Sequence, residues 1–222
     1  MKNATKISME KTLNFNAELL QYGTPDGPPE FLDALSSFLS AEYREPFSDN
    51  LVLSAGATSG LIYLLSQIFP NKTIIWAEQL SYFLAISMLK NSLSFQIRDI
   101  KIESDGIDLE DLENKWYSTY SIKECEEAKM NQKFLCALYL VPHYHNPTGT
   151  KLSSEKCEKI IKLARKYSIL VFCDDVYNIL HYNDKVNRRL FAYDNPKDED
   201  YGIGHVISNG TFSKLLSPGL RI

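Results

Sequence analysis

The chain has few cysteines, no long apolar run and no excess of positive charge, and each absence narrows what the protein can be. Four cysteines occur in 222 residues without a closely spaced pair, which favours free thiols in a reducing compartment over a disulfide framework. No apolar run approaches the roughly 20 residues that a membrane-spanning helix needs. The net charge is −4 and the lysines and arginines are dispersed, so no nucleic-acid footprint is present.

The N-terminal residues also lack the features of a targeting segment. No hydrophobic stretch follows the first lysines, which argues against a secretory signal, and no arginine precedes Arg44, which argues against a transit peptide. No helix-turn-helix pattern or basic region occurs before Leu20. We therefore expect a cytoplasmic protein that binds neither a membrane nor nucleic acid.

Strand-like apolar runs alternate with helical patterns along the chain. Helical spacing predicts helices near 30–42, 58–69, 81–91 and 153–167, whereas 108–131 is ambiguous and 183–201 reads as a polar loop. Strands are expected at 51–53, 73–77, 95–100, 134–141, 169–173 and 205–208. This alternation predicts an α/β fold with three α/β/α layers, in which helices cover both faces of a mostly parallel central sheet.

One lysine stands among hydroxyl residues near the end of the chain. Lys214 follows Thr211 and Ser213, and Arg221 lies seven residues further on. A lysine amine can form a Schiff base with a phosphorylated aldehyde cofactor, while hydroxyls and a guanidinium hold its phosphate. Because Ser-Lys pairs also occur by chance on solvated loops, the hypothesis needs support from other segments.

A loop of small residues opens the expected helix 58–69. Gly56, Ala57 and Thr58 lie at its start, where free backbone N–H groups and the positive end of the helix dipole suit a phosphate. Many helices begin after small residues for capping alone, and that reading also fits the pattern.

Two further candidates follow strand-like runs. Tyr82 can stack on a planar cofactor ring, although ordinary packing explains it equally well. Asn146 lies in a loop at the end of a strand, where α/β proteins place ligands, and it can donate to a phenolate oxygen of the cofactor. His143 and His145 nearby match no metal-site spacing, so we predict no metal.

Two carboxylates end the buried-looking run 169–173. An acid there is costly unless it is paired, and a protonated pyridine nitrogen would be such a partner for Asp174. Tyr177 is placed to hydrogen-bond the ring oxygen beside Asn146. The alternative is that Asp174 and Asp175 cap the next element.

Taken in order, these motifs resemble the class I/II aminotransferases of fold type I, the aspartate-aminotransferase-like superfamily that uses pyridoxal 5′-phosphate (PLP). The resemblance covers the chain from about Leu20 to Ile222, with Thr211 where serine is more usual and Leu80-Ser81 in place of a common Pro-Thr. It rests on these motifs: Gln21-Tyr22-Gly23 with Gly27, Gly56-Ala57-Thr58, Tyr82, Asn146-Pro147-Thr148-Gly149, Asp174-Asp175-Val176-Tyr177, and Ser213-Lys214 with Pro218-Gly219-Leu220-Arg221.

The resemblance implies a role for each candidate. Lys214 would form the internal aldimine and shuttle a proton between the substrate Cα and the cofactor C4′, and Asp174 would pair with the pyridine nitrogen. Asn146 and Tyr177 would bond the 3′-oxygen, with Tyr177 counted among the catalytic residues, and Tyr82 would stack on the ring. The phosphate-binding loop and its partners would be Gly56, Ala57, Thr58, Thr211, Ser213 and Arg221. Tyr22 would reach the phosphate of the neighbouring subunit, which implies a homodimer with shared sites.

The implied protein is an enzyme that moves an amino group between an amino acid and a 2-oxo acid. Its motifs resemble most those of the branch that includes 2-aminoadipate and aromatic transaminases. A lyase or synthase of the same fold, or a catalytically silent PLP-binding fragment or dimer partner, are the alternatives. Residues 1–24 are expected to be an N-terminal remnant of the small domain, which is otherwise largely missing. Residues 25–222 would form the PLP-binding large domain, incomplete at its C-terminus, because the resemblance implies a further central strand and a carboxylate-binding arginine beyond Ile222.

Overall fold

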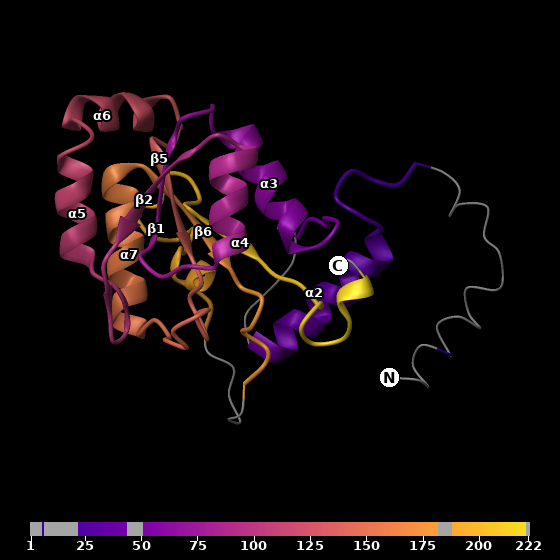
Figure 1. The fold of residues 1–222 in the computed structure, drawn as a ribbon. Coiled ribbons are helices and arrows are strands. Elements are labelled where there is room, and N and C mark those ends of the chain that lie inside the picture. Colours follow the sequence, from indigo (N-terminus) through magenta and orange to yellow (C-terminus); the bar gives the residue numbers. More distant parts are fainter. Residues whose placement is uncertain (1–5, 7–21, 44–50, 182–187, 221–222) are drawn as a thin grey trace.

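The computed structural model describes residues 6, 22–43, 51–181 and 188–220, and it has three layers (Figure 1). The middle layer is a sheet of five strands in the order β2-β1-β5-β6-β7, and all neighbouring strands are parallel. The strands are β1 (Ile74–Glu78), β2 (Gln96–Ile100), β5 (Cys136–Leu140), β6 (Ile169–Asp174) and β7 (Val206–Asn209). The predicted fold class is confirmed.

Helices cover both faces of the sheet. In Figure 1, α5 (Leu109–Tyr117), α6 (Ile122–Met130) and α7 (Ser154–Tyr167) lie on one side, and α3 (Ala57–Ile68) and α4 (Phe83–Ser87) lie on the other. The helix α2 (Pro29–Tyr43) lies apart from the sheet beside the C-terminal residues, where the rings of Phe38 and Phe212 are 5.9 Å apart. Both faces of the central strands must therefore be apolar, which explains why β1, β5 and β6 are nearly continuous apolar runs.

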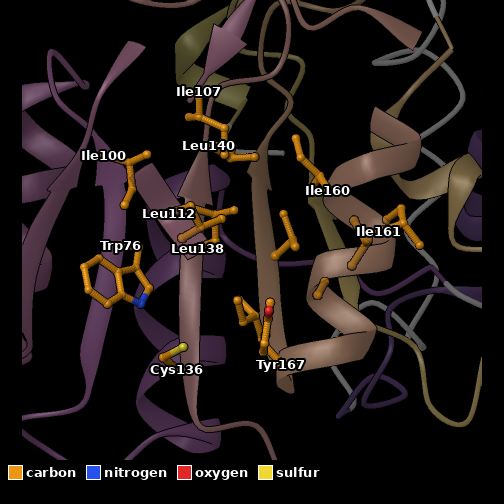
Figure 2. Close-up of a cluster of buried hydrophobic side chains, with 14 of the residues drawn as sticks. Trp76, Ile100, Ile107, Leu112, Cys136, Leu138, Leu140, Ile160, Ile161 and Tyr167 are labelled. Carbon is orange, nitrogen blue, oxygen red and sulfur yellow. The ribbon is translucent and has the colours of Figure 1, made fainter. Parts of the chain in front are cut away.

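Alternate residues of each central strand enter two separate cores. On β6, Val171 and Cys173 belong to the core under α5, α6 and α7, whereas Leu170 and Phe172 belong to the core under α3 and α4. Figure 2 shows the first of these cores, in which Leu138 of β5 and Ile160 and Ile161 of α7 are labelled. Each fully buried aliphatic or aromatic side chain contributes about 1.5–3 kcal/mol relative to an exposed one.

The helix α7 begins and ends where the sequence predicts. Ser153 is its N-cap, and the Ser153 Oγ accepts a hydrogen bond from the backbone N–H of Lys156 at 3.2 Å. At the other end, Ser168 adopts a left-handed conformation, and its backbone N–H donates to the carbonyl of Ala164. Cys157, Ile160, Ile161 and Ala164 face the core, as the helical spacing requires.

Several elements differ from the sequence prediction. The ambiguous stretch 108–131 forms two helices, α5 and α6, and a small hairpin of β3 (Ile102–Glu103) and β4 (Gly106–Ile107) precedes them. The helix expected at 81–91 is α4 continued by a π-helical segment, η2 (Met88–Ser92). In the expected polar loop, Leu190 is fully buried at the start of a 3₁₀ helix, η3 (Leu190–Tyr193).

The strand expected at 51–53 is not formed, and this prediction is wrong. The backbone N–H of Leu53 donates to the carbonyl of Asp26, and the segment joins neither described sheet. An apolar run becomes a strand only beside another strand, and here a cavity of about 630 Å³ lies between the segment and β7. Apolar side chains of α2, including Leu35 and Leu39, also line this cavity.

All four cysteines are buried free thiols. Among the described residues, no helix has the length and apolar character needed to cross a membrane.

Candidate active site

A cavity of about 180 Å³ opens at the carboxyl ends of the strands, where parallel sheets bind ligands. Most of the predicted site residues meet there, although they come from five separate segments of the chain. The predicted residues that line it are Ala57, Thr58, Tyr82, Asn146, Asp174, Tyr177, Thr211, Ser213 and Lys214.

Asp174 ends β6 and faces this cavity. The Tyr139 hydroxyl donates a hydrogen bond to Asp174 Oδ2 at 2.6 Å, whereas Oδ1 is buried and has no hydrogen-bond partner among the described residues. Burial raises the pKa of the Asp174 carboxyl to about 6, although the hydrogen bond from Tyr139 and the positive charge of Lys214 act in the opposite direction. The site therefore contains a carboxylate oxygen that lacks a donor.

Lys214 lies across the cavity in a turn that the Phe212 carbonyl stabilises by accepting hydrogen bonds from Leu215 and Leu216. Its side chain is exposed, and Nζ lies 6.0 Å from the centroid of the Tyr177 ring. A primary amine and a donor-deficient carboxylate thus line one small cavity. This pair suits a ligand with an electrophilic carbon at one end and a protonated ring nitrogen at the other.

The start of α3 forms another wall of the cavity. Gly56 is the N-cap residue and has φ of 82°, a conformation that favours glycine, and no side chain caps the helix. The first helical residues, Ala57 and Thr58, line the cavity. An N-terminus without a side-chain cap has backbone donors and a positive dipole end available to an anion.

Two hydroxyl residues lie opposite this helix start. The Thr211 hydroxyl donates to Ser213 Oγ at 3.1 Å, and the backbone N–H of Ser213 donates to Thr211 Oγ1 at 3.2 Å. Together with the first turn of α3 they supply neutral donors suited to a phosphate, as the sequence predicts.

The side chain of Asn209, at the end of β7, fixes where α3 begins. Asn209 Nδ2 donates to the carbonyl of Ala57 at 2.9 Å. A Cβ atom on Gly60 would lie 2.6 Å from Asn209 Oδ1, so only glycine permits this approach. Neither Asn209 nor Gly60 is among the site residues predicted from the sequence.

Buried polar contacts tie the Asn146 loop to β1. Glu78 Oε2 accepts from the backbone N–H of Val141 at 3.0 Å and lies 3.0 Å from His145 Nε2. On the other side of the ring, His145 Nδ1 is 2.8 Å from the Thr148 hydroxyl. These contacts surround Asn146, whose peptide bond to Pro147 is cis.

The two histidines of this loop, His143 and His145, are both buried. His145 is engaged by Glu78 and Thr148, and burial lowers the pKa of His143. Within the described ranges, no group of three or more His, Cys, Asp or Glu side chains is arranged to hold a metal ion.

The remaining predicted residues have different positions. Tyr82 lies just before α4 on the cavity wall, and its pKa is raised by burial and by the nearby Tyr177 and Asp174. Tyr22 is fully exposed and does not line the cavity, so its role toward a second subunit stays a prediction. Arg221 lies outside the described residues.

Tyr139 is the residue of this site that the sequence analysis missed most clearly. It lies on β5, paired with Phe172 of β6, two residues before Asp174. Because strand residues alternate between faces, Phe172 and Asp174 share one face of β6 with Tyr139 beside them. The alternation of side chains along each strand could be predicted from the sequence, but the pairing of β5 with β6 could not.

The sequence matches the family "Aminotransferase class I and II" over residues 2–222. The chain belongs to the class I and II aminotransferases. Members of this family use pyridoxal phosphate, and the donor-deficient Asp174 oxygen, the Lys214 amine and the uncapped helix start fit that cofactor.

This aminotransferase chain resembles proteins of two kinds. It is 30% identical over 209 residues to YcxD, an uncharacterized HTH-type transcriptional regulator of Bacillus subtilis, covering 94% of the chain and 42% of that protein. It is 29% identical over 232 residues to the mitochondrial kynurenine/alpha-aminoadipate aminotransferase of Mus musculus, covering 100% and 51%. The chain thus spans about half the length of these relatives.

A solved structure gives the same result for the fold. Pyrococcus horikoshii kynurenine aminotransferase, solved in complex with PMP and with kynurenine as substrate, superposes with a TM-score of 0.78 at 26% identity. The match covers 99% of this aminotransferase chain and 50% of that one.

Proposed function

We propose that the protein is a PLP-dependent aminotransferase that moves an amino group between an amino acid and a 2-oxo acid. The observation that carries the proposal is the cavity in which the buried, donor-deficient Oδ1 of Asp174 and the amine of Lys214 both lie. Family membership supports the same cofactor.

Each residue has a defined task in this proposal. Ala57 and Thr58 amides and the Thr211 and Ser213 hydroxyls hold the phosphate, Tyr82 stacks on the ring, and Asn146 and Tyr177 bond the ring oxygen. Asp174 holds a proton on the ring nitrogen. When bound, PLP supplies an electron sink that stabilises negative charge at the substrate Cα.

Lys214 acts on the substrate in the proposed reaction. Its Nζ would be the group that holds the carbonyl carbon of the bound cofactor and, as a free amine, would take the proton from the substrate Cα. A neutral amine is the form that can do both.

We propose that the amino-acid substrate is 2-aminoadipate or an aromatic amino acid. This proposal is supported by two similar proteins, the kynurenine/alpha-aminoadipate aminotransferase of Mus musculus and the kynurenine aminotransferase of Pyrococcus horikoshii. We further propose that residues 25–222 form the PLP-binding large domain and that two copies share their sites through Tyr22.

The test is substitution of the lysine. Lys214→Ala should abolish transamination of 2-aminoadipate and kynurenine with 2-oxoglutarate, because no other described side chain supplies an amine to this cavity. The visible absorbance of lysine-bound PLP should disappear as well. Lys90→Ala, at an exposed position of η2, is the matched control and should leave both unchanged.

Three outcomes separate the alternatives. Turnover by Lys214→Ala at the unaltered rate would refute the assignment. Cofactor binding by the unaltered protein without turnover would support a catalytically silent PLP-binding protein. Release of ammonia or another small group in place of amino transfer would support a lyase or synthase of the same fold.

A further inference from the structure

Among the residues that the structure describes, only the phenol of Tyr139 donates a hydrogen bond to the Asp174 carboxylate. Its Oη lies 2.6 Å from Asp174 Oδ2, across the pairing of β5 with β6. The ring is fully buried and stacks on Phe172, with centroids 6.3 Å apart and an interplanar angle of 19°. Packing therefore holds the hydroxyl in one place.

This bond leaves the two carboxylate oxygens in different states. Oδ2 has a donor, whereas the buried Oδ1 has none within the part of the chain that the structure describes. A carboxylate held through one oxygen by a fixed donor cannot rotate freely, so Oδ1 keeps its direction. If the carboxylate could rotate, ligand binding would have to fix its orientation, and the entropy lost would reduce the binding free energy.

We infer that Tyr139 is a positioning residue that acts through Asp174, keeping the carboxylate ionised and directing Oδ1 to the ring nitrogen of the cofactor. The inference rests on the proposed function, but its first test does not need the cofactor. In this role Tyr139 does not touch the cofactor or the substrate.

The charges around Asp174 make such a donor necessary. Asp175 follows it and repels its negative charge, and burial removes water from the group. Lys214 across the cavity is the opposing positive charge, and Tyr82, Tyr177 and the Glu78 carboxylate also face this region. Burial and the neighbouring Asp174 raise the pKa of Tyr139 well above its usual value, so the phenol remains a neutral donor.

The first test is a titration of the apoprotein by ¹³C NMR with labelled aspartate, in which Asp174→Asn identifies the Asp174 signal. Tyr139→Phe removes the donor without changing ring packing. Because a hydrogen bond to the charged form favours ionisation, its loss should raise the Asp174 midpoint from about 6 by about one pH unit. The control Tyr120→Phe, whose hydroxyl bonds the Leu135 carbonyl, should not move it.

The second test uses the loaded protein and PLP labelled with ¹⁵N in the ring. In Tyr139→Phe the ring-nitrogen resonance should move toward that of an unprotonated pyridine, because a more basic carboxylate draws the proton away. The Tyr139→Phe change should have no further effect on this resonance when Asp174→Asn is already present. An unchanged Asp174 midpoint would overturn the inference by itself, and so would an unchanged ¹⁵N resonance in the loaded protein.

The outcomes for the two proposals can be distinguished. If the unaltered protein takes up no PLP, the proposed function fails, and an unmoved Asp174 midpoint in Tyr139→Phe would separately refute the role of Tyr139. If Tyr139→Phe does not fold, Asp174→Asn tests the same hydrogen bond by changing its acceptor. The Tyr139 ¹³Cζ resonance should then shift in Asp174→Asn, and an unshifted resonance would refute the bond.

Discussion

Asp174 shows how one side chain can oppose folding in a proposed active site. The pKa of its carboxyl is about 6 in the folded protein, compared with 3.8 for the exposed group, chiefly because of burial. For an acid whose pKa is raised by folding, the protonated form is the one that the folded state favours. Stability is therefore lost as the pH rises from about 4 to about 6, and the full loss persists above that range.

Replacing this carboxyl should stabilise the apoprotein. We expect Asp174→Asn to increase the free energy of unfolding at pH 8 by about 2 kcal/mol, because the amide carries no charge to desolvate. The gain should vanish below about pH 3, where the aspartate is protonated in both states. Urea unfolding at a series of pH values measures it.

The control for this prediction is Asp99→Asn, because the Asp99 side chain is 65% exposed. Its effect should be small at every pH. A loss of stability at pH 8 in Asp174→Asn would contradict the account of Asp174 given above.

At the scale of elements, the junction of α3 with β7 depends on a glycine, because Gly60 has no Cβ atom. Gly60 of α3 lies against Asn209, and an added Cβ would meet Asn209 Oδ1 at 2.6 Å and Ser54 Oγ at 3.1 Å. The same asparagine holds the Ala57 carbonyl at the start of the helix. The position of the proposed phosphate-binding turn therefore follows from this contact.

Gly60→Ala should lower the free energy of unfolding by about 1–2 kcal/mol. Steric overlap with Asn209 destabilises the junction, although the better helix propensity of alanine offsets part of the cost. PLP should also bind more weakly, because the Ala57 and Thr58 amides move with the helix. Chemical unfolding and cofactor titration measure the two effects.

Gly23→Ala is the matched control, since an added Cβ there meets nothing within 4 Å. It should leave both quantities nearly unchanged. If Gly60→Ala were as stable as the unaltered protein, α3 would not depend on this close approach.

The elements also show which predictions local sequence supports. The bounds of α7 were predictable because Ser153 and the apolar spacing act within the helix itself. The run 51–53 was predicted as a strand and is not one, because strand formation requires a neighbour that local sequence does not reveal. The hairpin of β3 and β4 was missed because each strand has only two residues.

At the scale of the whole molecule, Arg165 joins α7 to the segment that leads into β7. Its guanidinium contacts Asp194 at 2.8 Å, Asp198 at 3.0 Å and Asp200 at 2.5 Å. Asp194 is buried and also accepts the backbone N–H of His205 at 2.5 Å. One cation thus fixes both the segment and the start of the edge strand.

Arg165→Met should lower the free energy of unfolding by about 3 kcal/mol. Methionine retains much of the apolar stem, but the buried Asp194 carboxylate loses its positive partner, and an uncompensated buried charge is costly. Thermal or urea unfolding measures the loss. Lys162→Met, on the exposed face of the same helix, is the control, and a loss below about 1 kcal/mol in Arg165→Met would refute the account.

The edge of the sheet bears on the predicted domain organisation. Among the described strands, β7 is paired only with β6, and the cavity of about 630 Å³ lies beside it. The sequence analysis predicts that residues 25–222, which include this edge strand, form one PLP-binding large domain. That part of the domain assignment stays a prediction.

The alternation of helices and strands, the three-layer fold class and the order of the site motifs could all be predicted from the sequence. These follow from the apolar period, capping residues and strand-end polar residues, which depend on neighbours only a few positions away. Tertiary structure alone decided that Tyr139 meets Asp174, that Asn209 meets Gly60, and that 51–53 remains outside the sheet. Such contacts depend on which strands pair and in what register, and residues far apart in the chain set both.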